Sequence, residues 1–121
     1  MSKKIEEYSL ENLMNKIEEL LNANSAPFQG FNANYQFDID GEESGVYQLR
    51  FQDGKATMQE GSGTPADCRL IMSLGNFHLF LLGKLNGTMA FMTGKLKING
   101  DIGKAMKIES ILRQYSVKEQ L

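Results

Sequence analysis

Three consecutive segments in which apolar and polar residues alternate constrain the fold of this chain most strongly; they are residues 34–39, 47–52 and 55–60. A period of two is typical of β-strands that bury one face and leave the other exposed. Short polar turns separate the segments, and Asp53-Gly54 is a strong hairpin signal because both residues tolerate positive φ angles. The pattern therefore predicts an antiparallel meander of three strands.

Two further strands and three helices are predicted around this meander. The strands span residues 68–72 and 95–100, and the helices span residues 9–22, 74–82 and 102–113. Helical spacing of apolar residues supports each helix, and the second helix is apolar around nearly its whole circumference. We expect residues 87–93 to form an apolar linker and the polar tail, 114–121, to fray. The order α-β-β-β-β-α-β-α indicates an α+β fold in which helices cover one face of a sheet.

Length and composition bound the class of protein. A chain of 121 residues, 41% of them hydrophobic, has the size of one domain, so residues 1–121 are expected to form a single domain. The net charge of −2 gives no reason to expect nucleic-acid binding. The single cysteine, Cys68, fits a reducing compartment, and residues 1–7 lack the apolar stretch of a secretory signal, so a cytoplasmic location is predicted.

The tripeptide Gly-Lys-Leu occurs twice, at residues 83–85 and 94–96. A phosphate-binding loop needs a serine or threonine after the lysine, and leucine follows in both copies, so this class of site is excluded. The copies lie 11 residues apart, closer than the ~20-residue minimum of common structural repeats. We interpret the two glycines as boundaries of secondary-structure elements: Gly83 ends an apolar helix, and Gly94 lets the chain enter a strand.

The order of motifs in the C-terminal half is more specific than its composition. The predicted apolar helix is followed by Gly83-Lys84-Leu85-Asn86, by a short segment with Ala90-Phe91, and by Gly94-Lys95-Leu96-Lys97-Ile98-Asn99-Gly100-Asp101. An apolar helix with Ala105-Met106-Lys107 comes next, and Asp67 with Leu70-Ile71-Met72-Ser73 lies upstream. Over residues 5–113 this order resembles the sterol carrier protein 2 family.

The resemblance implies a five-stranded, largely antiparallel sheet covered by helices, with a hydrophobic tunnel between sheet and helices. Such a tunnel accepts sterols, fatty acids or acyl chains, and the resemblance implies no catalytic residue in this domain. The expected function is therefore binding and transfer of lipids such as fatty acids, acyl-CoA thioesters or sterol-like molecules. No enzymatic activity, cofactor or metal is expected.

Apolar and flexible side chains are the candidates for the tunnel wall, because a polarizable thioether adapts to an irregular ligand. The candidate ligand-binding residues come from two helices, the linker and a strand: Phe77, Phe80, Leu81, Met89, Phe91, Met92, Leu96, Ile98, Ile102 and Met106. The alternative is that these residues form ordinary core, which periodicity alone favours.

Two other classes of function stay open. The broad apolar face of residues 102–112 suits a protein–protein interaction or dimerisation module. His78 is the candidate for an enzyme acting on lipid-like substrates, although no second histidine or cysteine lies near it in the sequence. Cys68 is expected to pack as a small hydrophobic side chain. The acidic run at residues 38–43 is interpreted as a hairpin turn rather than a calcium loop.

Charge is unevenly distributed along the chain. Residues 83–107 contain one acidic residue, Asp101, and the lysines Lys84, Lys95, Lys97, Lys104 and Lys107. A basic surface beside an apolar opening suits anionic lipid headgroups, so transient contact with anionic membranes is expected. The simpler interpretation is a solvated, lysine-rich face.

Overall fold

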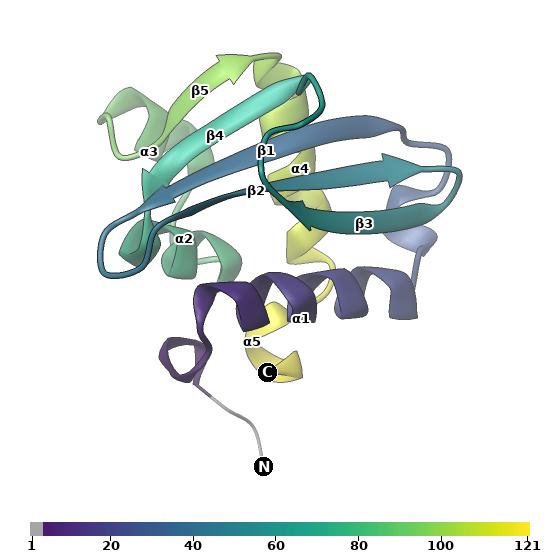
Figure 1. The fold of residues 1–121 in the computed structure, drawn as a ribbon, viewed down its shortest axis with the longest axis horizontal. Coiled ribbons are helices and arrows are strands. Elements are labelled where there is room, and N and C mark those ends of the chain that lie inside the picture. The colour runs from purple at the N-terminus through teal and green to yellow at the C-terminus, as the bar shows by residue number, and fades with distance from the viewer. Residues whose placement is uncertain (1–3) are drawn as a thin grey trace.

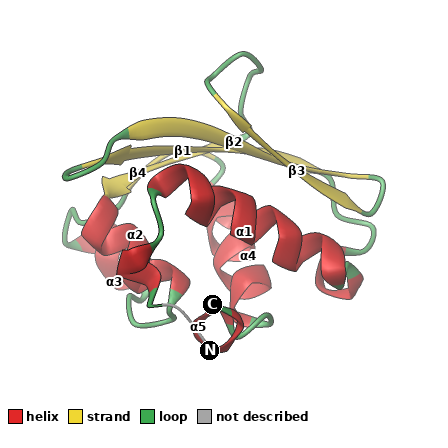
Figure 2. Ribbon diagram, turned by 60° about the horizontal axis from the view of Figure 1, so that its bottom comes forward, coloured by secondary structure: helices red, strands yellow, loops and turns green. Residues whose placement is uncertain are grey.

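In the computed structural model, which describes residues 4–121, five strands form one sheet and the helices pack on one of its faces (Figure 1, Figure 2). The strands are β1 (Ala33–Asp40), β2 (Gly45–Gln52), β3 (Lys55–Glu60), β4 (Cys68–Ser73) and β5 (Lys97–Gly100). The helices are α1 (Leu10–Ala23), α2 (Leu74–Leu81), α3 (Gly87–Met92), α4 (Ile102–Arg113) and α5 (Val117–Gln120), with 3₁₀ turns at Ile5–Glu7 and Ala26–Phe28. The predicted α+β class is confirmed.

The strand order is β3-β2-β1-β4-β5, and every neighbouring pair is antiparallel except β1 with β4, which is parallel. The predicted meander is the β3-β2-β1 half of this sheet. Its Asp53-Gly54 turn has positive φ at both residues, 53° and 75°. Alternate side chains such as Tyr35, Leu49 and Leu70 are fully buried beneath the helices, as the period of two predicts.

The parallel pairing depends on residues 61–67, which connect β3 to β4 across the sheet face that the helices leave open (Figure 2). Gln48 of β2 donates a hydrogen bond to the Thr64 carbonyl and accepts one from the Thr64 amide. Asn34 of β1 donates from Nδ2 to the Pro65 carbonyl at 2.8 Å. Both amide side chains are buried, so hydrogen bonds rather than a crossover helix hold this connection in place.

Polar side chains of α1 cover the outer edge of β3. Asn22 donates from Nδ2 to the Ala56 carbonyl at 2.7 Å and accepts from the Ala56 amide at 2.9 Å. Glu18 accepts from the Met58 amide at 2.7 Å. An uncovered edge strand offers unpaired backbone groups to other chains. These bonds therefore fix α1 on the sheet and also block pairing at this edge.

The two Gly-Lys-Leu tripeptides terminate two helices with the same hydrogen bonds. Gly83 and Gly94 have φ angles of 74° and 79°. The amide of Lys84 donates to the Leu79 carbonyl at 2.8 Å, and the amide of Lys95 donates to the Ala90 carbonyl at 2.9 Å. This is the Schellman pattern, in which a left-handed glycine lets the chain satisfy the last carbonyls of a helix. The prediction that Gly83 ends a helix is confirmed. Gly94, predicted to let the chain enter a strand, instead ends the helix α3.

Two segments differ from the sequence prediction. Residues 87–93, predicted as a linker, contain the helix α3, because Asn86 caps its first turn and Gly94 its last. The tail, predicted to fray, includes α5, and Tyr115, Val117 and Leu121 are buried. The Tyr115 hydroxyl donates to the carbonyl of Asn24 just after α1, so a few apolar residues are enough to fold a polar tail back onto the domain.

We predict that Asn22→Ala lowers the free energy of unfolding by about 1–2 kcal/mol, because it leaves both backbone groups of Ala56 without their protein partner. Asn15→Ala is the matched control, since Asn15 is an exposed residue of the same helix with no hydrogen bond described. Chemical denaturation of the two variants measures the difference. Equal stabilities would show that the edge of β3 gains nothing from α1.

A second prediction compares two glycines with positive φ. A Cβ at Gly100, whose φ is 104°, would lie 2.4 Å from the Asp67 carbonyl oxygen, whereas a Cβ at Gly94 would meet nothing within 4 Å. Gly94→Ala should cost about 1 kcal/mol of stability from backbone strain alone. Gly100→Ala should cost roughly 3 kcal/mol or more, because backbone must also move. Thermal melts that rank the two variants in the opposite order would contradict this account.

Candidate functional site

The structure divides the ten predicted ligand-binding residues into an interior set and a surface set. Phe77, Phe80, Leu81 and Leu96 are buried in the core, and Ile98 and Met106 are partly buried against it. The exposed members are Met89, Phe91, Met92 and Ile102. With Leu79 they are the large hydrophobic side chains that are exposed within residues 4–121. Exposed apolar surface on this protein is thus concentrated on and around α3.

The helix α3 is attached to the domain by few contacts. Of its six residues, Gly87 and Ala90 are buried. The Gly87 amide donates to Oε2 of Glu109 on α4 at 2.9 Å, and the Thr88 hydroxyl lies 3.3 Å from the sulfur of Met106. A Cβ at Gly87 would lie 2.8 Å from the Glu109 carboxylate, so a side chain here would require that carboxylate to shift. The helix is therefore held mainly by its caps and by Glu109.

Met106 connects this surface with the start of α4. It lies four residues after Ile102, and residues at that spacing share one face of a helix. Met106 also lines a hollow of about 410 Å³ along α4, together with Glu109 and Arg113. The side chains of Ile102 and Met106 thus continue the apolar surface of α3 along α4.

The lysines of the basic segment fall into two groups. Lys104 pairs with Asp101 at 3.5 Å, and the ammonium of Lys107 lies 5.6 Å from the centre of the Phe31 ring. A second group, Lys84, Lys95 and Lys97, is exposed, and no ion pair is described for it within residues 4–121. Lys84 and Lys95 belong to the two glycine caps that flank α3. The apolar helix is therefore bordered by cations without carboxylate partners.

The predicted tunnel does not correspond to the hollows described within residues 4–121. The largest, about 580 Å³, lies on the open side of the sheet beside Arg69 and Asn99, and another of about 340 Å³ lies there beside Arg50 and Lys55. One of about 340 Å³ lies where the N-terminal turn, the end of α2 and the tail meet. Of the ten predicted residues, Met106 borders one of the five hollows described. The tunnel stays a prediction.

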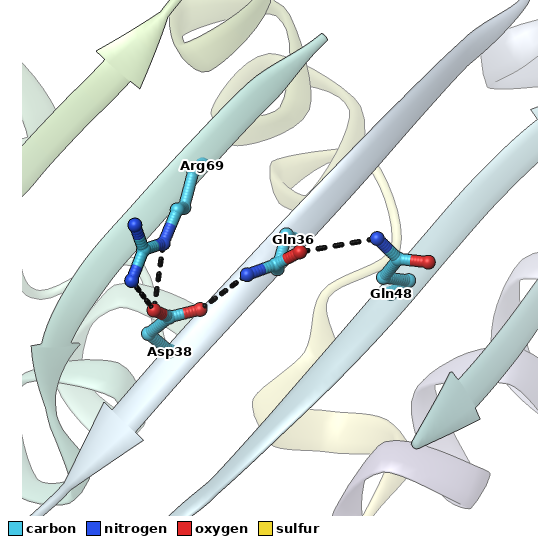
Figure 3. Close-up of polar contacts among 4 residues, drawn as sticks. All are labelled: Gln36, Asp38, Gln48 and Arg69. Atoms are coloured by element: carbon cyan, nitrogen blue, oxygen red, sulfur yellow. Dashed lines mark hydrogen bonds and ion pairs between the residues drawn. The ribbon is translucent and has the colours of Figure 1, made fainter. Parts of the chain in front are cut away.

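The open face of the sheet carries a chain of polar side chains (Figure 3). Gln48 donates to Oε1 of Gln36 at 3.1 Å, and Gln36 donates to Oδ1 of Asp38 at 2.9 Å. Arg69 of β4 donates from Nε to Oδ2 of Asp38 at 2.7 Å. Burial opposes ionisation of Asp38, but the hydrogen bonds from Arg69 and Gln36 and the charge of Arg69 outweigh it and lower the pKa of Asp38. This network ties β2, β1 and β4 together.

The candidates for covalent or acid–base chemistry are poorly placed. Cys68 is fully buried, and burial together with Asp101 and Asp67 raises the pKa of its thiol to about 11. A protonated, enclosed thiol is a poor nucleophile. The Nε2 atom of His78 is buried and has no hydrogen-bond partner within residues 4–121. Neither residue forms the paired arrangement that nucleophilic catalysis uses.

Sequence reasoning did not identify Glu109 as part of this site. A single glutamate on the polar side of a helix gives no signal by itself, and its partner Gly87 lies 22 residues away. The short length of residues 87–93 also concealed α3. The flanking caps, Asn86 with the second Gly-Lys-Leu, were the available signal.

Comparisons with known proteins agree with this architecture. A profile of the SCP-2 sterol transfer family matches residues 14–113. The chain belongs to the SCP-2 sterol transfer family. Among its relatives, hydroxysteroid dehydrogenase-like protein 2 of Xenopus tropicalis is 47% identical over 85 residues, which cover 69% of this chain and 20% of that protein. The chain thus spans about a fifth of the length of the curated relatives it matches.

Solved structures of SCP-2 proteins superpose on nearly the whole chain. The sterol carrier protein domain 2 of Helicoverpa armigera is 26% identical, covers 96% of this chain and 94% of its own, and has a TM-score of 0.75. Sterol Carrier Protein 2 of Yarrowia lipolytica, in its apo form, is 27% identical, covers 96% of this chain and 98% of its own, and has a TM-score of 0.74.

No helix within residues 4–121 has the length and apolarity that crossing a membrane would need.

The Asp38–Arg69 pair generates a prediction about pH. Because the pKa of Asp38 is lowered in the folded state, its contribution to stability is present above its ordinary pKa of 3.8 and is lost as pH falls below that value. Wild type should therefore be more stable than Asp38→Asn at pH 6, and the gap should close below about pH 4. Asp40→Asn, two residues along the same strand, is the control. A gap that is independent of pH would contradict the prediction.

Proposed function

We propose that this SCP-2 protein binds lipids or other apolar small molecules without catalysing a reaction on them. The observation that carries the proposal is the concentration of exposed apolar side chains on α3 and the adjoining part of α4, within a family named for sterol transfer. Fatty acids, acyl-CoA thioesters and sterol-like molecules are the proposed ligands. The activity of the much longer dehydrogenase-like relatives is not part of this proposal. A cytoplasmic location stays a prediction.

The proposed site lies between α3, α4 and the sheet, and it opens when α3 moves. A close-packed interior has no room for an acyl chain unless some part yields. Elements with few buried contacts open most readily, and α3 buries only Gly87 and Ala90 of its six residues. Movement of α3 would break the bond between Gly87 and Glu109 and would free Met106 from Thr88. Flexible methionines suit a wall that reshapes around its ligand.

The alternative function, an interaction or dimerisation module, has less support. It rests on the broad apolar face predicted for residues 102–112. In the fold, Ala105, Ile108, Ile111 and Leu112 of that face are buried in the protein's own core. The breadth of the face is therefore explained by packing of α4 within the domain.

The test is displacement of a fluorescent fatty acid by an unlabelled one. We expect saturable binding to wild type and about fivefold to tenfold weaker binding to Met106→Gln, because a polar amide replaces a thioether on the wall. Met58→Gln is the matched control, since Met58 is also partly buried against the core but lies on β3 under α1. Absence of saturable binding to wild type would contradict the proposed function. Equal losses in both variants would remove Met106 from the site.

A further inference from the structure

We propose that α3 and its two flanking glycine caps form the surface with which this protein docks on an anionic lipid bilayer. The inference rests on the proposed lipid-binding function and names the element that would meet the membrane. It concerns Met89, Phe91 and Met92, whose side chains enter the apolar layer. It also concerns the exposed lysines of the adjoining chain, Lys84, Lys95 and Lys97.

Exposure of α3 is unusual for this protein. Met89 is 58% exposed, Phe91 40% and Met92 74%. Three large apolar side chains of a six-residue helix thus face solvent, while α1 buries its own apolar stripe. Scattered exposed apolar residues are ordinary, but a concentrated group marks a contact surface. The three side chains share one well-defined helix, because Asn86 caps the start of α3 and Gly94 caps its end.

The charge around α3 indicates which kind of partner would bind this surface. Residues 68–100 contain no aspartate or glutamate. Lys84, Lys95 and Lys97 are exposed within this stretch, and no ion pair is described for them in residues 4–121. The neighbouring carboxylate, Glu109, is engaged by Gly87 and Arg113. A surface with unpaired cations and apolar side chains complements anionic headgroups above an acyl layer.

The size of the surface favours a bilayer over a protein partner. A stable protein–protein interface uses about 20–30 residues on each side, and α3 offers a single short helix. Membrane association instead needs two modest signals, a small apolar insertion and a basic patch. Both signals coincide at α3. The same element is the one that must move in the proposed function, so docking would place the opening of the site against the bilayer.

Insertion can be observed directly because the chain contains no tryptophan. Met92→Trp places a single indole on the exposed face of α3, and Gln59→Trp places one on exposed β3 as the matched control. With vesicles of phosphatidylcholine and phosphatidylserine, we expect a blue shift and protection from acrylamide quenching for Met92→Trp and neither change for Gln59→Trp. An unshifted Met92→Trp spectrum on vesicle-bound protein overturns the proposal.

The electrostatic part is tested by sedimentation with vesicles at two salt concentrations. The double variant Lys95→Gln and Lys97→Gln should bind anionic vesicles about tenfold more weakly than wild type. The double variant Arg50→Gln and Lys55→Gln loses the same charge on the open face of the sheet and should bind as wild type does. Raising the salt concentration should weaken wild-type binding. Equal binding of wild type to pure phosphatidylcholine vesicles, or equal losses in both double variants, overturns the proposal.

Two further outcomes separate the possible failures. If wild type displaces the fluorescent fatty acid but does not sediment with anionic vesicles, the docking surface is wrong and the proposed function stands. If it sediments without binding the fatty acid, the proposed function fails and the docking surface stands. A blue shift of Met92→Trp that grows with protein concentration in the absence of vesicles would identify a second copy of the chain as the occupant and overturn the proposal.

Discussion

The hydrogen bonds of two buried amide side chains, Gln48 and Asn34, fix the connection on which the arrangement of the sheet depends. They fix residues 61–67 across the open face of the sheet and so deliver β4 to a parallel position beside β1. A buried amide left without a partner costs roughly 1–3 kcal/mol, so this crossover has few alternatives. The parallel position of β4, from which α2 follows directly in the chain, depends on this connection.

The same corner also fixes β5 and α4. The Asp67 carboxylate accepts a hydrogen bond from the backbone N–H of Asn34 at 2.8 Å. The backbone carbonyl of Asp67 accepts one from the backbone N–H of Asp101 at 3.1 Å. Gly100 is needed here because any side chain would collide with that carbonyl. The start of α4, whose N-cap is Asp101, is therefore tied to the first strand of the meander. One side of the proposed site, at the start of α4, is held by these contacts. The other side is α3, which is attached to the domain by few contacts.

Two ways of stabilising a helix coexist in this domain. The long helices α1 and α4 bury an apolar face, and their stability comes from packing. The short helix α3 buries little and is defined by hydrogen bonds at its two ends. Apolar residues on such a helix remain free for another partner. This difference explains how one stretch of chain can be ordered and still expose Met89, Phe91 and Met92.

Much of the fold was predictable because its signals are local. Alternation specified the strands, helical spacing specified α1 and α4, and Asp53-Gly54 specified a hairpin turn whose φ angles the structure confirms. The candidate site was predictable only in part. Residues of α3 were identified as apolar and outside the ordinary helices. Their exposure, and the role of Glu109 in holding α3, depend on contacts that no local pattern records.

The sequence by itself determined the strands, the helices α1, α2 and α4 and the main turns, because backbone propensity and side-chain periodicity act over a few neighbouring residues. Only the tertiary structure decided that β4 lies parallel to β1, that the tail folds back, and which apolar residues remain at the surface. Those outcomes depend on pairs far apart in the chain, such as Gln48 with Thr64 and Gly87 with Glu109. Burial is a property of the assembled domain, since a methionine is core or surface only after its neighbours are in place.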